Sequence, residues 1–164
     1  MSSYDRVEFA PLWPAGFHPL TVSQIRDLCV DSFPLSETRK GLLDSLEVVI
    51  GMLEQAGVPG VIWLNGSFVT EKINPTDIDF IFVVESQVYD DGTREQKEIL
   101  DALTGNEIWK PPMLCDCNVA YLDPPEQQGT STVLAYWEKR FGLSVNDKAP
   151  KGIVQIEVIS QMSQ

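Results

Sequence analysis

Two aspartates, one residue apart, head an apolar run in the middle of the chain, in the segment DIDFIFVV. Residues i and i+2 of a strand point to the same face, so Asp77 and Asp79 would share one patch. Charge repulsion and lost hydration make such a pair costly for folding. Either the pair lies at a solvated strand end and has no role, or a cation neutralises it.

A glycine-serine turn precedes the two acids. Gly66 has no Cβ, which lets a ligand approach the backbone closely, and Ser67 adds a hydroxyl donor. We expect a brief helical segment to begin here, whose first amides and dipole suit phosphate. The carboxylates suit Mg²⁺, a hard ion that binds carboxylates together with substrate phosphates.

Asp116, in LCDCN, is the best candidate for a third acid. It lies in the middle of a predicted strand with apolar residues around it, where an unpaired carboxylate is expensive. Three acids would allow two Mg²⁺ ions about 3.5–4 Å apart, with Mn²⁺ as a substitute. The alternative is that Asp116 accepts hydrogen bonds from a neighbouring loop, and we favour the metal ligand.

The stretch LNGSFVTEKINPTDIDF resembles the hallmark of the polymerase-β-type nucleotidyltransferase superfamily. That hallmark is a hydrophobic residue, Gly, then Gly or Ser, followed after nine to thirteen residues by two acids that alternate with hydrophobic residues. Gly66-Ser67, a gap of nine residues and Asp77-Ile78-Asp79-Phe80 correspond to it. The resemblance implies that Asp77, Asp79 and Asp116 are catalytic metal ligands and that Gly66 and Ser67 bind nucleotide phosphates.

A wider resemblance covers most of the chain. The segments GFHP, GSFVTEK, DIDF, YWEKRFG and KGIVQIEV are similar to short bacterial and phage proteins of that superfamily. Such minimal, single-domain members lack the helical second domain of larger relatives. The resemblance implies a site that is completed by homodimerisation or by a partner subunit.

Apolar periodicity predicts one α+β domain with a mixed sheet of about four strands covered by helices. The single domain, 1–164, would comprise an extended arm (1–20), two helices (21–57) and a catalytic unit of sheet and helices (61–160). Strands are predicted at 61–65, 77–84, 113–122 and 152–159. Helices are predicted near 22–32, from Ser36 to Gly57, at 93–104 and from Thr130 to Gly142. The first helix should turn Ile25, Leu28 and Cys29 inward.

Composition excludes several classes of protein. The 164 residues have ordinary globular values of 43% hydrophobic and 22% charged residues. A net charge of −12 argues against a generic nucleic-acid binder. Three cysteines and one histidine make a disulfide framework or a structural zinc site improbable, so Cys115 and Cys117 are predicted to be small buried hydrophobes. No apolar run has the length of a membrane span, which favours a cytoplasmic protein.

The predicted activity is transfer of a nucleoside monophosphate from an NTP, taken as ATP, to a hydroxyl. The acceptor hydroxyl can belong to a protein side chain, an RNA end, a small molecule or another nucleotide. A non-catalytic nucleotide sensor or antitoxin-like module of the same fold is one alternative, and a plain structural domain is another. Lys72 is a candidate for reaching the triphosphate and Trp109 for stacking on the base, whereas Lys148 and Lys151 are predicted to be surface charges.

Overall fold

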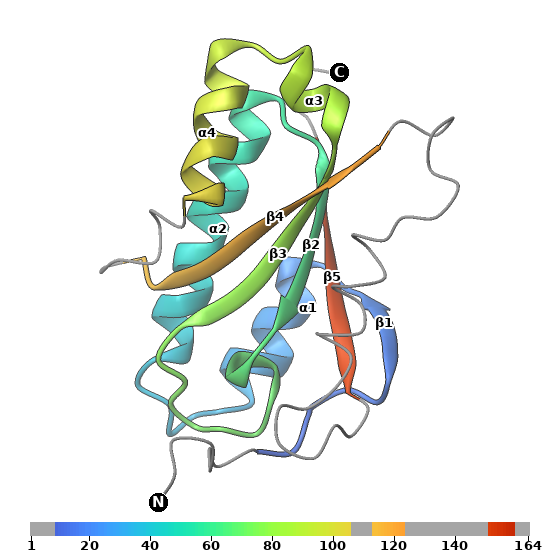
Figure 1. The fold of residues 1–164 in the computed structure, drawn as a ribbon. Helices are drawn as coiled ribbons and strands as arrows, with labels where there is room; N and C mark the ends of the chain where they lie inside the picture. Colours follow the sequence, from blue (N-terminus) through green and yellow to red (C-terminus); the bar gives the residue numbers. More distant parts are fainter. Residues whose placement is uncertain (1–8, 106–112, 124–150, 160–164) are drawn as a thin grey trace, which may run out of the picture.

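A computed structural model gives the fold and describes residues 9–105, 113–123 and 151–159 (Figure 1). The described strands form one mixed sheet in the order β1-β5-β2-β3-β4. The strands are β1 (Gly16–Pro19), β2 (Gly60–Asn65), β3 (Ile78–Glu85), β4 (Cys115–Leu122) and β5 (Gly152–Val158). The helices are α1 (Val22–Arg26), α2 (Arg39–Ala56), α3 (Ser86–Asp90) and α4 (Arg94–Thr104).

The α+β class and the mixed sheet are confirmed, but the expected number of strands was wrong. Five strands are present because β1, from the segment predicted to be an extended arm, pairs in parallel with β5. Four residues long and mostly exposed, β1 has almost no apolar alternation by which it could have been recognised. The other strands lie within one or two residues of their predicted ranges.

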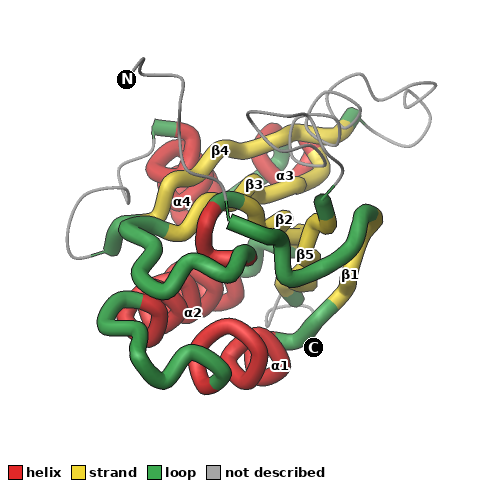
Figure 2. The backbone as a smooth tube through the Cα atoms, turned by 90° about the horizontal axis from the view of Figure 1, so that it is seen from below, coloured by secondary structure: helices red, strands yellow, loops and turns green. Residues whose placement is uncertain are grey.

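The sheet has two chemically different faces. Even-numbered residues of β3, such as Phe80 and Phe82, belong to the main core together with residues of α2 and α4. Odd-numbered residues such as Ile81 and Val83 form a second cluster, which among the described residues contains strand residues only. Figure 2 shows α1 and α2 together on one side of the sheet. Odd-numbered positions of β3 therefore face away from these helices.

The first helix differs in one respect from its prediction. Thr21 and Gln24 form the expected capping box, and α1 continues into a π-helical turn at Asp27–Asp31. Ile25 and Cys29 are fully buried, but Leu28 is 46% exposed, so its predicted inward position was wrong. A π turn has more residues per turn than an α-helix. Counted from Ile25, it therefore keeps Cys29, four residues on, on the buried face and rotates Leu28, three residues on, outward.

Helix α2 is the long helix of the core. Its predicted apolar stripe is buried, and Gly57 ends the helix with a positive φ of 77°. Ser36 accepts a hydrogen bond from the backbone N–H of Arg39 at 3.1 Å, although Thr38 occupies the N-cap position. The stripe comprises Leu42, Leu43, Leu46, Val49, Ile50 and Leu53.

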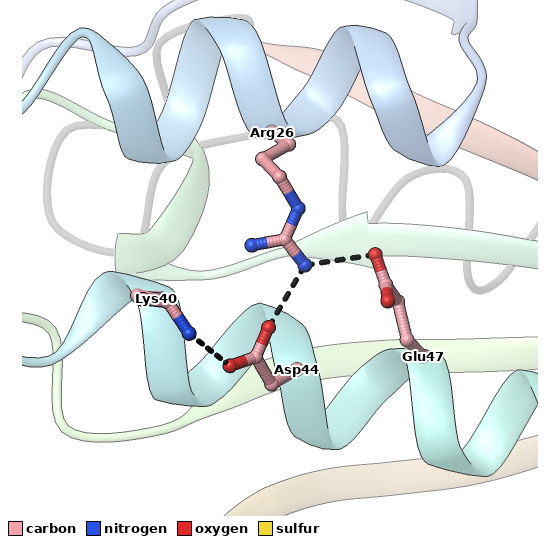
Figure 3. A network of polar contacts seen from close by, with 4 residues as sticks. All are labelled: Arg26, Lys40, Asp44 and Glu47. Carbon is pink, nitrogen blue, oxygen red and sulfur yellow. Dashed lines mark hydrogen bonds and ion pairs between the residues drawn. The ribbon is translucent and has the colours of Figure 1, made fainter.

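An ion-pair network joins α1 to α2 on the surface (Figure 3). The Nη2 atom of Arg26 lies 2.9 Å from Asp44 and 2.8 Å from Glu47. Lys40 contacts Asp44 from the same helix at 2.9 Å. Lys40 and then Arg26 hold the pKa of the Asp44 carboxyl below its usual value. Exposed pairs of this kind contribute little free energy each, so burial of Ile25 and Cys29 is the stronger link between the helices.

Helix α4 follows its prediction closely. Thr93 and Gln96 form a capping box, Ile99, Leu100 and Leu103 are buried, and Gly105 ends the helix. The predicted helix at 130–142, Trp109 and Lys148 lie outside the described residues. In the part of the chain that the structure describes, no helix has both the length and the apolar character needed to cross a membrane.

Candidate metal centre

Three carboxylates meet at one edge of the sheet, on the face opposite α2. Asp77, Asp79 and Asp116 each offer an oxygen, and these oxygens all lie within 4.8 Å of one another. All three side chains are half-buried. The structure thus brings together the three acids that the sequence singled out, and the group can hold a metal ion.

The pairing of β3 with β4 explains this convergence. The two strands are parallel, so they begin at the same edge, and Asp79 is in register with Asp116. The N–H of Ile78 donates to the carbonyl of Leu114 at 3.1 Å, which joins the two strand starts. Asp77 directly precedes β3 and has the same parity as Asp79, so it lies toward the same face.

Burial makes Asp79 the most perturbed of the three acids. Loss of hydration, then the charges of Asp77 and Asp116 and a hydrogen bond with Asp116, raise the pKa of Asp79 to about 8. Lys151 acts in the opposite direction and lowers that pKa. A bound cation would favour the ionised carboxylate, because its positive charge offsets the repulsion among the three acids.

The donor set selects for hard cations. Carboxylate oxygens suit Mg²⁺, Ca²⁺ and Mn²⁺, whereas thiolates suit softer metals. Cys115 and Cys117 flank Asp116 in sequence, but they are buried in the main core on the opposite face. Their predicted role as small buried hydrophobes is confirmed, and the site on this face is an all-oxygen one among the described residues.

Gly66 lies directly against the acids. Its φ is +76°, a conformation that side chains other than glycine rarely adopt. A Cβ atom at this position would collide with Oδ2 of Asp79 and approach its Cγ to 2.8 Å. The absence of a side chain at Gly66 therefore leaves room for the carboxylate of Asp79.

The turn after Gly66 is shorter than a phosphate-binding helix. Ser67–Val69 form a single 3₁₀-helical turn, so the predicted brief helical segment is present but ends well before Asn74-Pro75, where it was expected to end. Three residues align too few peptide dipoles for a helix dipole of useful size, so that part of the expectation was wrong. Any contribution of this turn to phosphate binding would come from local backbone groups and from the hydroxyl of Ser67.

Arg39 fixes the loop that connects the glycine-serine turn to the acids. Its guanidinium is fully buried and donates to the carbonyls of Phe68 (2.7 Å), Thr70 (2.6 Å) and Lys72 (2.6 Å) in that loop. Nε donates a second bond to the carbonyl of Lys72 at 3.1 Å, and Nη1 also donates to the carbonyl of Cys29 at 3.0 Å. One side chain thus satisfies four carbonyls from two segments and holds the loop against the start of α2.

This role of Arg39 was missed in the sequence. Arginine near the start of a helix normally lies in solvent, which is why it drew no attention. The signal was its position, three and four residues before Leu42 and Leu43, which places Arg39 on the buried stripe of α2. Its guanidinium also stacks on Phe33, with Cζ 3.7 Å from the ring centroid.

The structure places the two candidate lysines, Lys72 and Lys151, in different surroundings, and both are half-buried. Lys151, predicted to be a surface charge, is half-buried and close enough to Asp79 to lower its pKa. Lys72, the candidate for reaching a triphosphate, has its ammonium 5.9 Å from the ring centroid of Phe9. The sequence separates Lys151 from Asp79 by more than 70 residues, and only the antiparallel pairing of β2 with β5 brings their strand ends together.

Asn65 was also overlooked. It ends β2 and is in register with Asp79 on β3, so Asn65, Asp79 and Asp116 form a row across three strands. Asn65 is only 8% exposed. It stands at the position that the nucleotidyltransferase hallmark gives to a hydrophobic residue, which is the departure that could have revealed it.

Comparison with known families covers nearly the whole chain, including every residue of this site. Residues 7–157 match the model of a family of unknown function, DUF6932. The chain belongs to the DUF6932 family. No curated protein and no solved structure matches it significantly. The description of DUF6932 names no activity, so the function of this DUF6932 protein has to be argued from its site.

Proposed function

We propose that the protein is a Mg²⁺-dependent nucleotidyltransferase that transfers a nucleoside monophosphate from an NTP to a hydroxyl group. The observation that carries this proposal is the convergence of Asp77, Asp79 and Asp116, with their oxygens within 4.8 Å of one another, against the backbone of Gly66. The resemblance of Gly66-Ser67 and Asp77-Ile78-Asp79 to the nucleotidyltransferase hallmark gives that cluster its chemical meaning.

The donor set fits the proposed ion. All three side chains are carboxylates, and a half-buried triad without a cation holds one of them, Asp79, at a pKa of about 8. When bound, Mg²⁺ would supply Lewis-acid chemistry, lowering the pKa of an acceptor hydroxyl and neutralising phosphate charge. Carboxylates whose pKa is perturbed by burial and by one another are typical of functional sites.

The protein's own groups then have distinct tasks. Asp77 and Asp79 would hold the ions. Asp116 would hold the ion nearest the acceptor and would take up the proton of the acceptor hydroxyl. Gly66 would admit the phosphates close to the backbone, and Ser67 would donate a hydrogen bond to them. The acceptor oxygen forms a bond to the α-phosphorus, the bond to pyrophosphate breaks, and pyrophosphate leaves with the electron pair.

The test is a thermal melt with ATP, CTP, GTP and UTP, each with and without Mg²⁺. The proteins are the wild type, Asp116→Asn and, as a matched control, Asp91→Asn, whose side chain is exposed at the end of α3. A nucleotide at a hundred times its Kd should add about 2.7 kcal/mol, or about 5–10 °C for a chain of this size. We expect a Mg²⁺-dependent rise in the wild type and in Asp91→Asn that is lost in Asp116→Asn.

The stability of the mutant without ligand distinguishes the roles of Asp116. A metal ligand that crowds two other acids should leave Asp116→Asn as stable as the wild type or more stable. A structural hydrogen-bond acceptor would cost about 1–3 kcal/mol when replaced. The proposal fails if no NTP shifts the melt and Asp116→Asn unfolds early. Binding of an NTP without transfer of its labelled α-phosphate to any acceptor would identify a nucleotide sensor.

A further inference from the structure

The side chain of Asn65 has an oxygen with no apparent structural purpose. Its Oδ1 atom is buried and accepts no hydrogen bond within the described residues. A buried carbonyl without a donor costs about 1–3 kcal/mol, so most proteins avoid one. Leucine or phenylalanine would fill this position on a buried strand without that cost. Since the described residues offer this oxygen no donor, we look for its partner in a bound ligand.

The register of the sheet places the Asn65 side chain beside Asp79. Asn65 and Asp79 are directly opposite each other on antiparallel strands, and such pairs project to the same face with Cβ atoms about 4.5–5.5 Å apart. Asp116 continues the same row on the other side of Asp79. Asp79 is thus flanked by the amide of Asn65 and the carboxylate of Asp116.

The chemistry of an amide fits this place better than a fourth acid. Three carboxylates already crowd the site, and one more negative charge would increase their repulsion. A side-chain amide oxygen is a hard, neutral donor of the kind that binds alkaline-earth cations. It adds a ligand without adding charge.

We propose that Asn65 Oδ1 is a fourth oxygen ligand of the cation held by Asp77, Asp79 and Asp116. The inference rests on the proposed function insofar as it requires that cation. It goes beyond the nucleotidyltransferase hallmark, which has a hydrophobic residue at this position. The centre is then assembled from three strands, with β2 contributing a ligand as well as the turn that follows it.

The experiment measures Mn²⁺ binding by electron paramagnetic resonance, with and without a non-hydrolysable NTP analogue. The variants are Asn65→Leu, Asn65→Asp, Asp79→Asn and a matched control, Asn118→Leu. Asn118 lies on the same face of β4 but is exposed and in register with Ile81, one row away from the acids. Thermal melts of the four variants without metal provide the second readout.

We expect Asn65→Leu to weaken Mn²⁺ binding about ten-fold or more, while Asn118→Leu binds like the wild type. Without metal, Asn65→Leu should melt at the same temperature as the wild type or higher, because the unpaired oxygen is gone. Asn65→Asp keeps an oxygen at the position and should bind Mn²⁺ at least as tightly as the wild type.

Three results would overturn the inference, and they are distinguishable. Asn65→Leu could bind Mn²⁺ as tightly as the wild type while Asp79→Asn loses Mn²⁺ binding. That result would show that Asn65 is not a ligand and would leave the proposed function intact. A drop in both stability and affinity in Asn65→Leu, with no recovery in Asn65→Asp, would make Asn65 structural. Absence of Mn²⁺ binding by the wild type, with and without nucleotide, would overturn the cation site and the proposed function together.

Discussion

Gly66 and Asp79 are in such close contact that a Cβ atom on the glycine would occupy the position of the aspartate's carboxylate oxygen. The positive φ of Gly66 independently disfavours every other residue type there. Gly66 directly follows β2, whose last residue, Asn65, is paired with Asp79 on β3. The position of the Asp79 carboxylate therefore depends on a missing side chain immediately after the neighbouring strand.

Replacing Gly66 by alanine should damage both the fold and the site. We expect a loss of about 2 kcal/mol or more of unfolding free energy, from strain at positive φ and from the displaced carboxylate. Mn²⁺ affinity should fall with it. Chemical denaturation and metal titration measure the two effects. Gly51→Ala is the matched control, because nothing lies within 4 Å of its Cβ position in α2 and alanine should stabilise that helix by up to about 1 kcal/mol. Equal effects of the two substitutions would contradict the role given to Gly66.

The raised pKa of Asp79 predicts how stability without metal depends on pH. The folded protein holds this proton up to a pKa of about 8, against an ordinary value of 3.8 for the unfolded chain. The stabilising contribution of the protonated group is therefore complete below about pH 4 and is lost as the pH rises through about 8. The unfolding free energy of Asp79→Asn should equal that of the wild type at the acid end of the range and exceed it by about 1–2 kcal/mol at the alkaline end.

Urea denaturation across that pH range, without divalent cations, checks this prediction. Asp91→Asn serves as the control, since its exposed side chain should leave the wild-type pH profile unchanged. Added Mn²⁺ should stabilise the wild type more as the pH rises, because the cation and the proton compete for the same carboxylate. Parallel profiles for the wild type and Asp79→Asn would mean that Asp79 ionises normally in the fold.

Arg39 should be among the least replaceable residues of the chain. Arg39→Met would leave buried carbonyls of the loop and of Cys29 without a donor, at a cost of about 3 kcal/mol or more. Arg39→Lys keeps the charge but not the planar fork of donors, so it should also be destabilising. Arg94→Met, which removes an exposed guanidinium, should change stability by less than about 0.5 kcal/mol. Denaturation midpoints compare the three variants. If the Arg39 variants unfolded at the wild-type midpoint, the loop would have to be held by other contacts.

The three cysteines should react slowly in the native protein. All are buried, and burial raises the pKa of Cys29 and of Cys115 to about 12 and that of Cys117 well above its ordinary value. At a given mildly alkaline pH, Cys29 and Cys115 are then thiolates about a thousand-fold less often than a free cysteine, and Cys117 is also a thiolate far less often. Alkylation by iodoacetamide, followed by mass spectrometry, should label the urea-unfolded chain at all three sites and the native chain at a far lower rate. Rapid labelling of native Cys115 or Cys117 would show that β4 is not packed as described.

Much of the fold was predictable because the relevant signals are local. Helices α2 and α4 follow from apolar periodicity and from their ends at Gly57 and Gly105, and β3 follows from a continuous apolar run. The convergence of Asp77, Asp79 and Asp116 was predictable because burying a carboxylate on a core strand is costly unless a partner is nearby.

The missed features depend on contacts between distant segments. Strand β1 exists only because β5 offers it an edge, and Lys151 approaches Asp79 only through the pairing of β2 and β5. Arg39 and Asn65 were missed for another reason. Both are polar residues in buried positions. Their residue types alone predict exposure, and only the pattern of the neighbouring positions indicates that they are buried.

Core and site alternate along β3. Phe80 and Phe82 face the helices and hold the protein together, whereas Asp79 faces the other way and contributes to the candidate centre. Under the proposed function, a single base change that turns an acid of the centre into an amide would therefore abolish the reaction without unfolding the protein. The cellular abundance of such a variant would then be no measure of its activity.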